Sequence, residues 1–168
     1  MKIPRLMLPS LILAATLLGC GALLAQEKTP AAPTVLTDTL WLKAREGDAK
    51  ALAELRGRAE KGEASAQYNL GWMYANGQGV AKDEVEAVKW YRKAADQGFA
   101  DAQVNLGNMY WVGNGVVKDE LEAYKWFLLS GAQGDEFAKK KIPIVEKDLT
   151  ATQRLEGQRL AREWKSKK

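Results

Sequence analysis

The stretch that decides the fold is a tandem repeat. Residues 66–98 read AQYNLGWMYANGQGVAKDEVEAVKWYRKAADQG, and residues 102–134 read AQVNLGNMYWVGNGVVKDELEAYKWFLLSGAQG. With a period of 36 residues, 19 of the 33 aligned positions are identical, which excludes chance. A period of about 20 to 50 residues is typical of a solenoid, in which each unit buries its apolar side against its neighbours. The sequence therefore predicts stacked units at 64–99 and 100–135.

Each unit contains two stretches with helical periodicity. Apolar residues recur at spacings of three and four residues within 66–74 and again within 87–95, which predicts two helices with one buried stripe each. Gly77 and Gly79 lie between the two stretches, and glycine reaches positive φ without steric cost. We therefore expect a helical hairpin in each unit, with its turn at these glycines.

Capping residues mark the ends of each second helix. Asp83 and Asp119 are each followed three residues later by a glutamate, the spacing of an N-cap acid with a reciprocal N3 acid. Gly98 and Gly134 then fall where a glycine closes a helix. Because both aspartates occur at the same position of their units, we interpret them as helix caps rather than as catalytic acids.

These residues resemble the Sel1-like repeat, a tetratricopeptide-related helical family with the pattern AxxxLGxxYxxGxGVxxDxxxAxxWxxxAAxxG. The signature positions that match it are Leu70, Gly71, Tyr74, Gly77, Gly79, Asp83, Ala87 and Trp90, and in the second unit Leu106, Gly107, Tyr110, Gly113, Gly115, Asp119, Ala123 and Trp126. The second unit departs at Ser130 and Gly131, where paired alanines are expected; this change either loosens the helix end or leaves room for the next element. The resemblance implies an all-α fold, an α/α superhelix used for contacts between proteins.

Helical segments on both sides are predicted to cap the array. Residues 36–63 resemble a degenerate repeat, with an alanine and leucine pattern that ends in Gly62. Residues 136–168 are predicted to form two capping helices, of which Pro143 interrupts the first. The second begins at a capping box, Thr150–Gln153, and its Trp164 is expected to dock on the helix before it.

The first 25 residues have the composition of a secretory signal: a basic start, an apolar run and then small residues. The sequence before Cys20 resembles the lipobox of bacterial lipoproteins, in which the cysteine is acylated; ordinary cleavage after Ala25 is the alternative. An uncleaved anchor is a third interpretation, since the apolar run is long enough to span a bilayer of roughly 30 Å. We therefore expect export to the bacterial envelope, periplasmic or lipid-anchored, with residues 26–35 as a linker.

Composition excludes several classes of function. The chain has no histidine and one cysteine, so it cannot build a Ser/His/Asp triad, an HExxH zinc site or a disulfide framework. The glycine motifs lack the GK[ST] ending of a phosphate loop. The formal charge of +4 falls to about +2 without the leader, and the repeats mix both signs, which argues against nucleic acid as a partner. We expect no enzyme activity, no cofactor and no metal.

The second face of each first helix is the candidate partner-binding surface. Its positions vary between the units while their neighbours stay the same, and exposed aromatic residues there suit an interface. The candidates are Tyr68, Trp72, Asn76, Asn108 and Trp111. The alternative is that the two tryptophans fill the seams between units. A second candidate surface is the basic end at 149–168, which carries a local charge of +4 and either meets an anionic lipid or acidic partner or is a solvated helix face.

The predicted function is that of a non-catalytic adaptor of the bacterial envelope, which binds a partner protein of unknown identity through the repeat groove. Two alternatives remain open from the sequence. One is an enzyme or binding factor that acts on cell-wall glycan, and the other is a structural, membrane-tethered module.

Overall fold

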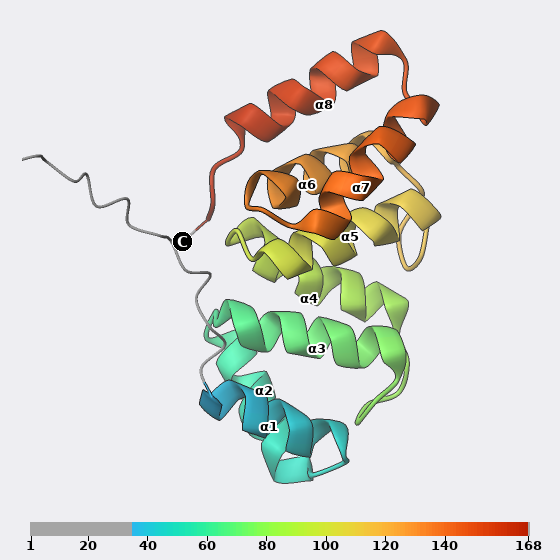
Figure 1. Cartoon of the computed structure of the whole chain (residues 1–168). Helices are drawn as coiled ribbons and strands as arrows, with labels where there is room; N and C mark the ends of the chain where they lie inside the picture. Colours follow the sequence, from blue (N-terminus) through green and yellow to red (C-terminus); the bar gives the residue numbers. More distant parts are fainter. Residues whose placement is uncertain (1–34, 168) are drawn as a thin grey trace, which may run out of the picture. The chain divides into compact units, whose positions relative to one another are not determined.

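The computed structural model describes residues 35–167, and this part of the chain is helical and contains no strand (Figure 1). Its helices are α1 (Val35–Arg45), α2 (Ala49–Glu60), α3 (Ala64–Asn76), α4 (Glu84–Asp96), α5 (Ala100–Val112), α6 (Glu120–Ala132), α7 (Glu136–Val145), a 3-10 turn (Glu146–Asp148) and α8 (Ala151–Glu163). The predicted all-α fold is confirmed. The expected signal segment, with Cys20, lies outside the described residues. Among the described helices, none combines the length and apolar character needed to cross a membrane.

The helices stack in chain order. Helix α3 packs on α4 and α5 packs on α6 within the two repeat units, while contacts of α4 with α5 and of α6 with α7 join neighbouring units (Figure 1). At the start of the array, α1 and α2 pack on each other, and both contact α3. This succession of nearest-neighbour contacts is the α/α solenoid that the repeat predicts.

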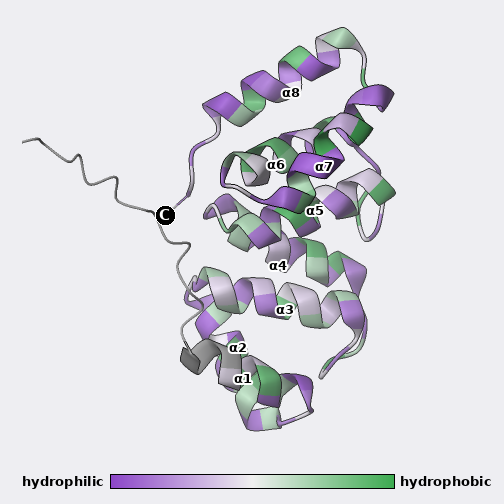
Figure 2. Cartoon of the chain, viewed as in Figure 1, coloured by the Kyte–Doolittle hydropathy of each residue, from purple (hydrophilic) through white to green (hydrophobic). Residues whose placement is uncertain are grey.

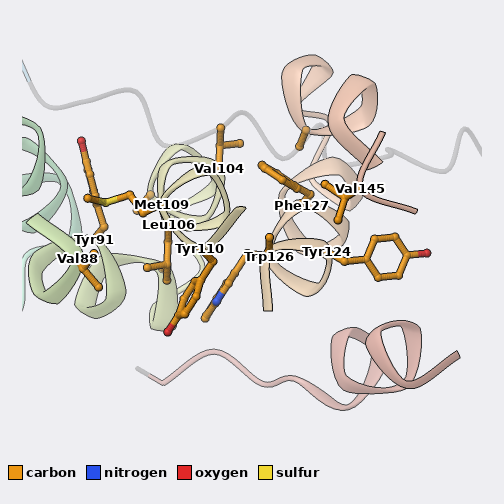
Figure 3. Packing of buried hydrophobic residues seen from close by; sticks show 14 of the residues in the cluster. Val88, Tyr91, Val104, Leu106, Met109, Tyr110, Tyr124, Trp126, Phe127 and Val145 are labelled. Carbon is orange, nitrogen blue, oxygen red and sulfur yellow. The ribbon is translucent and has the colours of Figure 1, made fainter. Parts of the chain in front are cut away.

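The repeated signature residues form the core. Leu70 and Leu106 occupy the same position in the two units, and neither has exposed surface. Figure 3 shows the larger of two core clusters, in which Leu106 and Tyr110 of α5 lie among Trp126 and Phe127 of α6. Burying a leucine or phenylalanine side chain contributes roughly 1.5 to 3 kcal/mol. The two units therefore share these residues because the residues fill the same core positions.

A glycine inside each first helix lets the two helices of a unit approach closely. A Cβ at Gly71 would lie 2.7 Å from Cδ1 of Tyr91, and a Cβ at Gly107 would lie 3.0 Å from Cε1 of Phe127. An aromatic ring of the second helix therefore occupies the space that a side chain would need. This contact explains why the signature has glycine in mid-helix despite its low helix propensity.

Glutamines link consecutive units through hydrogen bonds. The buried Gln67 donates Nε2 to the carbonyl of Ala59 at the end of α2 (2.9 Å), and Gln97 donates Nε2 to Oε1 of Gln67 (2.8 Å). Gln103 and Gln133 repeat the second of these bonds one unit later, at 2.8 Å. Since a buried amide without partners is costly, the bond from Gln67 to Ala59 helps to fix how one unit sits on the next, and the bonds between glutamines join the two helices of one unit.

The predicted caps are confirmed in part. Asp83 accepts the backbone N–H of Glu86 (2.9 Å) at the start of α4, and Asp119 caps α6 in the same way. The prediction of a reciprocal bond from the Glu86 side chain to the backbone N–H of Asp83 is wrong. The Glu86 carboxylate accepts a hydrogen bond from Nζ of Lys89 instead (2.8 Å). The N–H of Asp83 donates to the carbonyl of Tyr74 across the turn (2.9 Å). This N–H is therefore satisfied without the Glu86 side chain.

Pro143 lies inside α7 and does not interrupt it, contrary to the prediction. The helix continues to Val145, which is fully buried. Proline removes one N–H donor and leaves the carbonyl of Lys139 without its helical partner. Both Lys139 and Pro143 are exposed, so water can satisfy this carbonyl while burial of Val145 holds the helix end in place.

The last helix docks on α6 and not on α7, the helix before it, so the predicted docking partner is wrong. The Thr150–Gln153 capping box that starts α8 is confirmed. Trp164 meets Trp126 of α6 edge-on, with ring centroids 6.5 Å apart, and Gly157 lies against Tyr124 of α6. Helix α8 is mostly hydrophilic (Figure 2). Its position on α6 therefore depends on the contacts of Gly157 and Trp164.

The two departures of the second unit from the repeat pattern make different contacts. A Cβ at Gly131 would lie 3.2 Å from Cδ1 of Ile142 in α7, so this glycine leaves room for the following element. Ser130 instead donates its hydroxyl to the carbonyl of Ala100 at the start of α5, within the same unit (3.1 Å).

Candidate functional site

The five predicted partner-binding residues lie on α3 and α5, and each keeps part of its surface exposed. Trp72, Asn76 and Asn108 line one pocket of about 310 Å³ between these helices, next to α4. Tyr68 and Trp111 are not among its lining residues. The structure therefore brings three of the five together and leaves the other two outside the pocket.

Six further residues complete the pocket, and sequence reasoning did not select them. They are Ala75, Glu84, Tyr91, Asn105, Met109 and Asn114. The selection favoured positions that differ between units, so it passed over Asn105, which matches Asn69. Ala75 lies on the face that the sequence comparison identifies, but it is not among the five candidates. The sequence does contain one indication of the pocket. Ala75 and Trp111 occupy the same repeat position, and a small residue where the other unit has a large one predicts a gap in the unit with the small residue.

The pocket between the two units is lined at two repeat positions by the smaller of the two residues that occur there. Ala75 stands where the next unit has Trp111, and Asn108 stands where the preceding unit has Trp72. At the seam between α5 and α7 the larger side chains meet, and Nζ of Lys141 lies 4.2 Å from the ring centroid of Trp111. The seam between α3 and α5 lacks such a pair, which leaves the pocket.

Both candidate tryptophans also pack at seams. Trp72 meets Trp41 of α1 edge-on, with ring centroids 5.4 Å apart, and it packs against both core clusters. Trp111 packs against the larger cluster beneath Lys141. Each indole is half-buried. The seam-filling interpretation therefore describes their inner sides, and the remaining surface of Trp72 borders the pocket.

Tyr68 belongs to an aromatic group beside the pocket. Its ring lies 5.8 Å from that of Tyr91 and 5.2 Å from that of Phe99, measured between centroids. Burial raises the pKa of Tyr68, nearby Asp101 adds to the increase, and a hydrogen bond with Asn105 opposes it. Burial also raises the pKa of Tyr91. Both hydroxyls are therefore neutral at physiological pH, and Asn105 interacts with both.

The two aspartates interpreted as helix caps hold helix ends. Asp83 and Asp119 each accept a backbone N–H at the start of a second helix, at 2.9 Å in both units. Within the described residues, no three histidine, cysteine, aspartate or glutamate side chains gather in a way that could hold a metal ion.

The basic end of the chain is partly neutralised by its own acids. Arg159 pairs with Glu156 and Glu163 along α8, at 2.6 and 2.5 Å. Lys167 pairs with Asp96 at the end of α4 (2.9 Å), and its backbone N–H donates to the Asp96 carbonyl (2.7 Å). The contacts of Lys167 tie the C-terminal segment to the first unit, and the ion pairs together lower the positive charge available to a partner.

Comparison with known proteins places the repeats in one family. A family model described as Sel1 repeat matches residues 64–99 and 100–135. No curated protein matches the chain.

Two solved structures resemble the chain over most of its length. A Sel1 repeat protein from Oxalobacter formigenes is 40% identical with a TM-score of 0.58, and the match covers 64% of this chain and 87% of that one. The protein c5321, a protective antigen present in uropathogenic Escherichia coli strains displaying an SLR fold, is 38% identical with a TM-score of 0.70. That match covers 76% of this chain but 28% of the antigen, so this chain spans little more than a quarter of the antigen's length.

Proposed function

Because the chain belongs to the Sel1 repeat family, whose members generally serve as non-catalytic scaffolds that bind other proteins, we propose that it is an adaptor that binds a partner along the exposed face of α3 and α5. The observation that carries this proposal is the pocket between the two helices. It lies on the face whose residues differ between units, and one of its walls is the half-buried Trp72.

The chemistry of this face suits a protein interface. Solenoids use the extended surface formed by successive units to bind partners. Tryptophan and tyrosine are enriched among the residues that dominate binding energy, especially where they are partly desolvated before binding. Trp72 and Trp111 lie on consecutive units of the same face, so one extended segment of a partner can contact both.

Affinity capture after crosslinking in cell envelopes tests the adaptor function. We expect the parent chain to capture a partner stoichiometrically and the Trp72→Ala/Trp111→Ala variant to lose it, after circular dichroism confirms that both fold. A matched control is Val117→Ala/Leu155→Ala, which removes two exposed apolar side chains (86% and 67% exposed) away from the pocket. Capture that survives the tryptophan changes would contradict the proposed face and favour the basic C-terminal helix.

We further propose that the protein acts in the bacterial envelope. Support comes from the composition of residues 1–25 and the lipobox resemblance before Cys20. Metabolic labelling with palmitate tests this proposal, together with the mass of the mature N-terminus. Label that disappears in Cys20→Ser identifies a lipoprotein, and an unlabelled chain that begins at Gln26 identifies a soluble periplasmic protein. Full-length protein retained in the cytoplasm would contradict export.

A further inference from the structure

The pocket between α3 and α5 is lined by four asparagine side chains and one carboxylate. Asn76 donates Nδ2 to the carbonyl of Trp72 (2.8 Å), which leaves its Oδ1 as the free end of the amide. Asn105 also lines the pocket, and its side chain is partly exposed there.

The charge of the pocket lining favours a cationic ligand. Glu84 supplies a carboxylate, and none of the nine lining residues is basic. Oε1 of Glu84 lies 2.8 Å from Nζ of Lys82. Both partners of this ion pair are well exposed, so it contributes little energy, and Oε2 of Glu84 remains a free acceptor.

Within residues 35–167, most tryptophans of the chain have a positively charged side chain over the ring, but Trp72 at the pocket does not. Four of the six carry a cation of the chain's own over the ring: Arg45 over Trp41 (4.9 Å), Lys93 over Trp90 (3.9 Å), Lys141 over Trp111 (4.2 Å) and Lys125 over Trp126 (4.6 Å). Among the described residues, no cation lies over Trp72. The tryptophan at the pocket is thus left without the kind of contact that Trp111, at a different repeat position of the next unit, receives from Lys141.

We propose that this pocket binds an arginine side chain of the partner protein, an inference that rests on the proposed adaptor function. A guanidinium has five donors and no acceptor, so it complements the carboxylate and amide oxygens. It also stacks on indole and sheds water more readily than an ammonium does. A peptide backbone or an N-acetyl sugar carries no positive charge to pair with Glu84. The volume of about 310 Å³ suits one long side chain.

Titration of the purified full chain with N-acetyl-arginine methylamide, followed by NMR, tests the proposal. We expect saturable shifts of the Trp72 indole N–H and of the Asn105 and Asn108 side-chain amides. The neutral, nearly isosteric citrulline derivative should bind about tenfold more weakly, because it lacks the charge that a carboxylate recognises. Equal binding of the two probes would overturn the proposal, as would saturable binding of N-acetylglucosamine to the pocket in place of the arginine probe.

Variants separate the pocket from its surroundings. Ala75→Trp places in the pocket the residue that the next unit has there and should abolish arginine binding. Glu84→Gln should weaken it severalfold, while Val117→Ala, at an exposed position outside the pocket, should leave it unchanged. Arginine binding that survives Ala75→Trp would overturn the assignment.

This experiment and the capture experiment fail independently. A partner captured through Trp72, with no binding of the arginine probe, would leave the adaptor function standing and overturn the arginine site. Arginine binding without any captured protein would leave the site standing and contradict the adaptor.

Discussion

At the scale of single residues, Gly115 shows how one position joins two units. Its φ is +66°, and a Cβ there would collide with the carbonyl of Glu84 at the start of α4. Gly134 also has positive φ (+102°), but nothing lies within 4 Å of its Cβ position. Gly134 is therefore required only for its backbone conformation. Gly115 is required for its conformation and also because a side chain there would have no space.

We predict that Gly115→Ala lowers the free energy of unfolding by about 2 to 4 kcal/mol, since it combines left-handed strain of roughly 1 to 2 kcal/mol with a backbone collision. Gly134→Ala is the matched control and should cost about 1 to 2 kcal/mol from strain alone. Urea unfolding followed by circular dichroism measures both. Equal losses would show that the contact with Glu84 has no energetic weight.

Titration of the tyrosines tests the burial of the aromatic group beside the pocket. Burial raises the pKa of Tyr68, Tyr91 and Tyr124 above the ordinary value of 10.0. The raised pKa means that the folded state holds these protons longer than the unfolded state does, so their contribution to stability is complete below pH 10.0 and is lost as the pH rises above it. Ultraviolet titration should show tyrosines that ionise late. Tyr68→Phe should remove one of them, and a parent chain in which all tyrosines ionise together would contradict the burial.

At the scale of elements, α8 depends on a glycine for its docking. A Cβ at Gly157 would lie 3.1 Å from Cε1 of Tyr124 and still closer to Cδ1 of the same ring. The hydroxyl of Tyr124 donates to Glu146 (2.6 Å) and accepts from Gln158 (3.3 Å), so the ring cannot easily move aside. The backbone of α8 therefore rests directly on α6.

We predict that Gly157→Leu displaces α8 and costs roughly 1 to 3 kcal/mol, because the added side chain overpacks the contact. Leu155→Ala, an exposed position on the same helix, should stay within about 0.5 kcal/mol of the parent. Hydrogen exchange resolves the effect by element, with faster exchange expected in α8 and unchanged exchange in α3 and α4. Protection of α8 that matches the parent would contradict the docking described here.

The elements also show what local sequence patterns can and cannot predict. The paired helices of the two units follow from periodicity and from caps such as Asp83, which act within a few residues. The course of α7 through Pro143 and the docking of α8 on α6 were predicted wrongly. Both depend on contacts with distant residues, the burial of Val145 in one case and the fit of Gly157 to Tyr124 in the other.

At the scale of the whole molecule, stability should depend on every unit. Leu70 has no exposed surface and lies in the cluster that joins α2, α3 and α4. We predict that Leu70→Ala lowers the free energy of unfolding by about 2 to 5 kcal/mol through the cavity it leaves. Thermal unfolding followed by circular dichroism measures this loss, and a variant that melts like the parent would contradict the stacked core.

The candidate site shows the same limit on prediction at this larger scale. Sequence comparison of the two units selected Trp72, Asn76 and Asn108, which do line the pocket. It missed Asn105 and Glu84, since a pocket between two units is set by the fit of side chains across the seam. That fit becomes visible only when α3 and α5 are placed side by side.

The central claim is that a partner protein occupies the face of α3 and α5, and crosslinking from defined positions tests it most directly. A photo-reactive amino acid at position 76 or 108, at the pocket, should yield one discrete adduct with a partner in intact cells. The same group at position 155, on the exposed side of α8, should yield none. Adducts that form only from position 155 would contradict the claim, and so would the absence of any adduct from the two pocket positions.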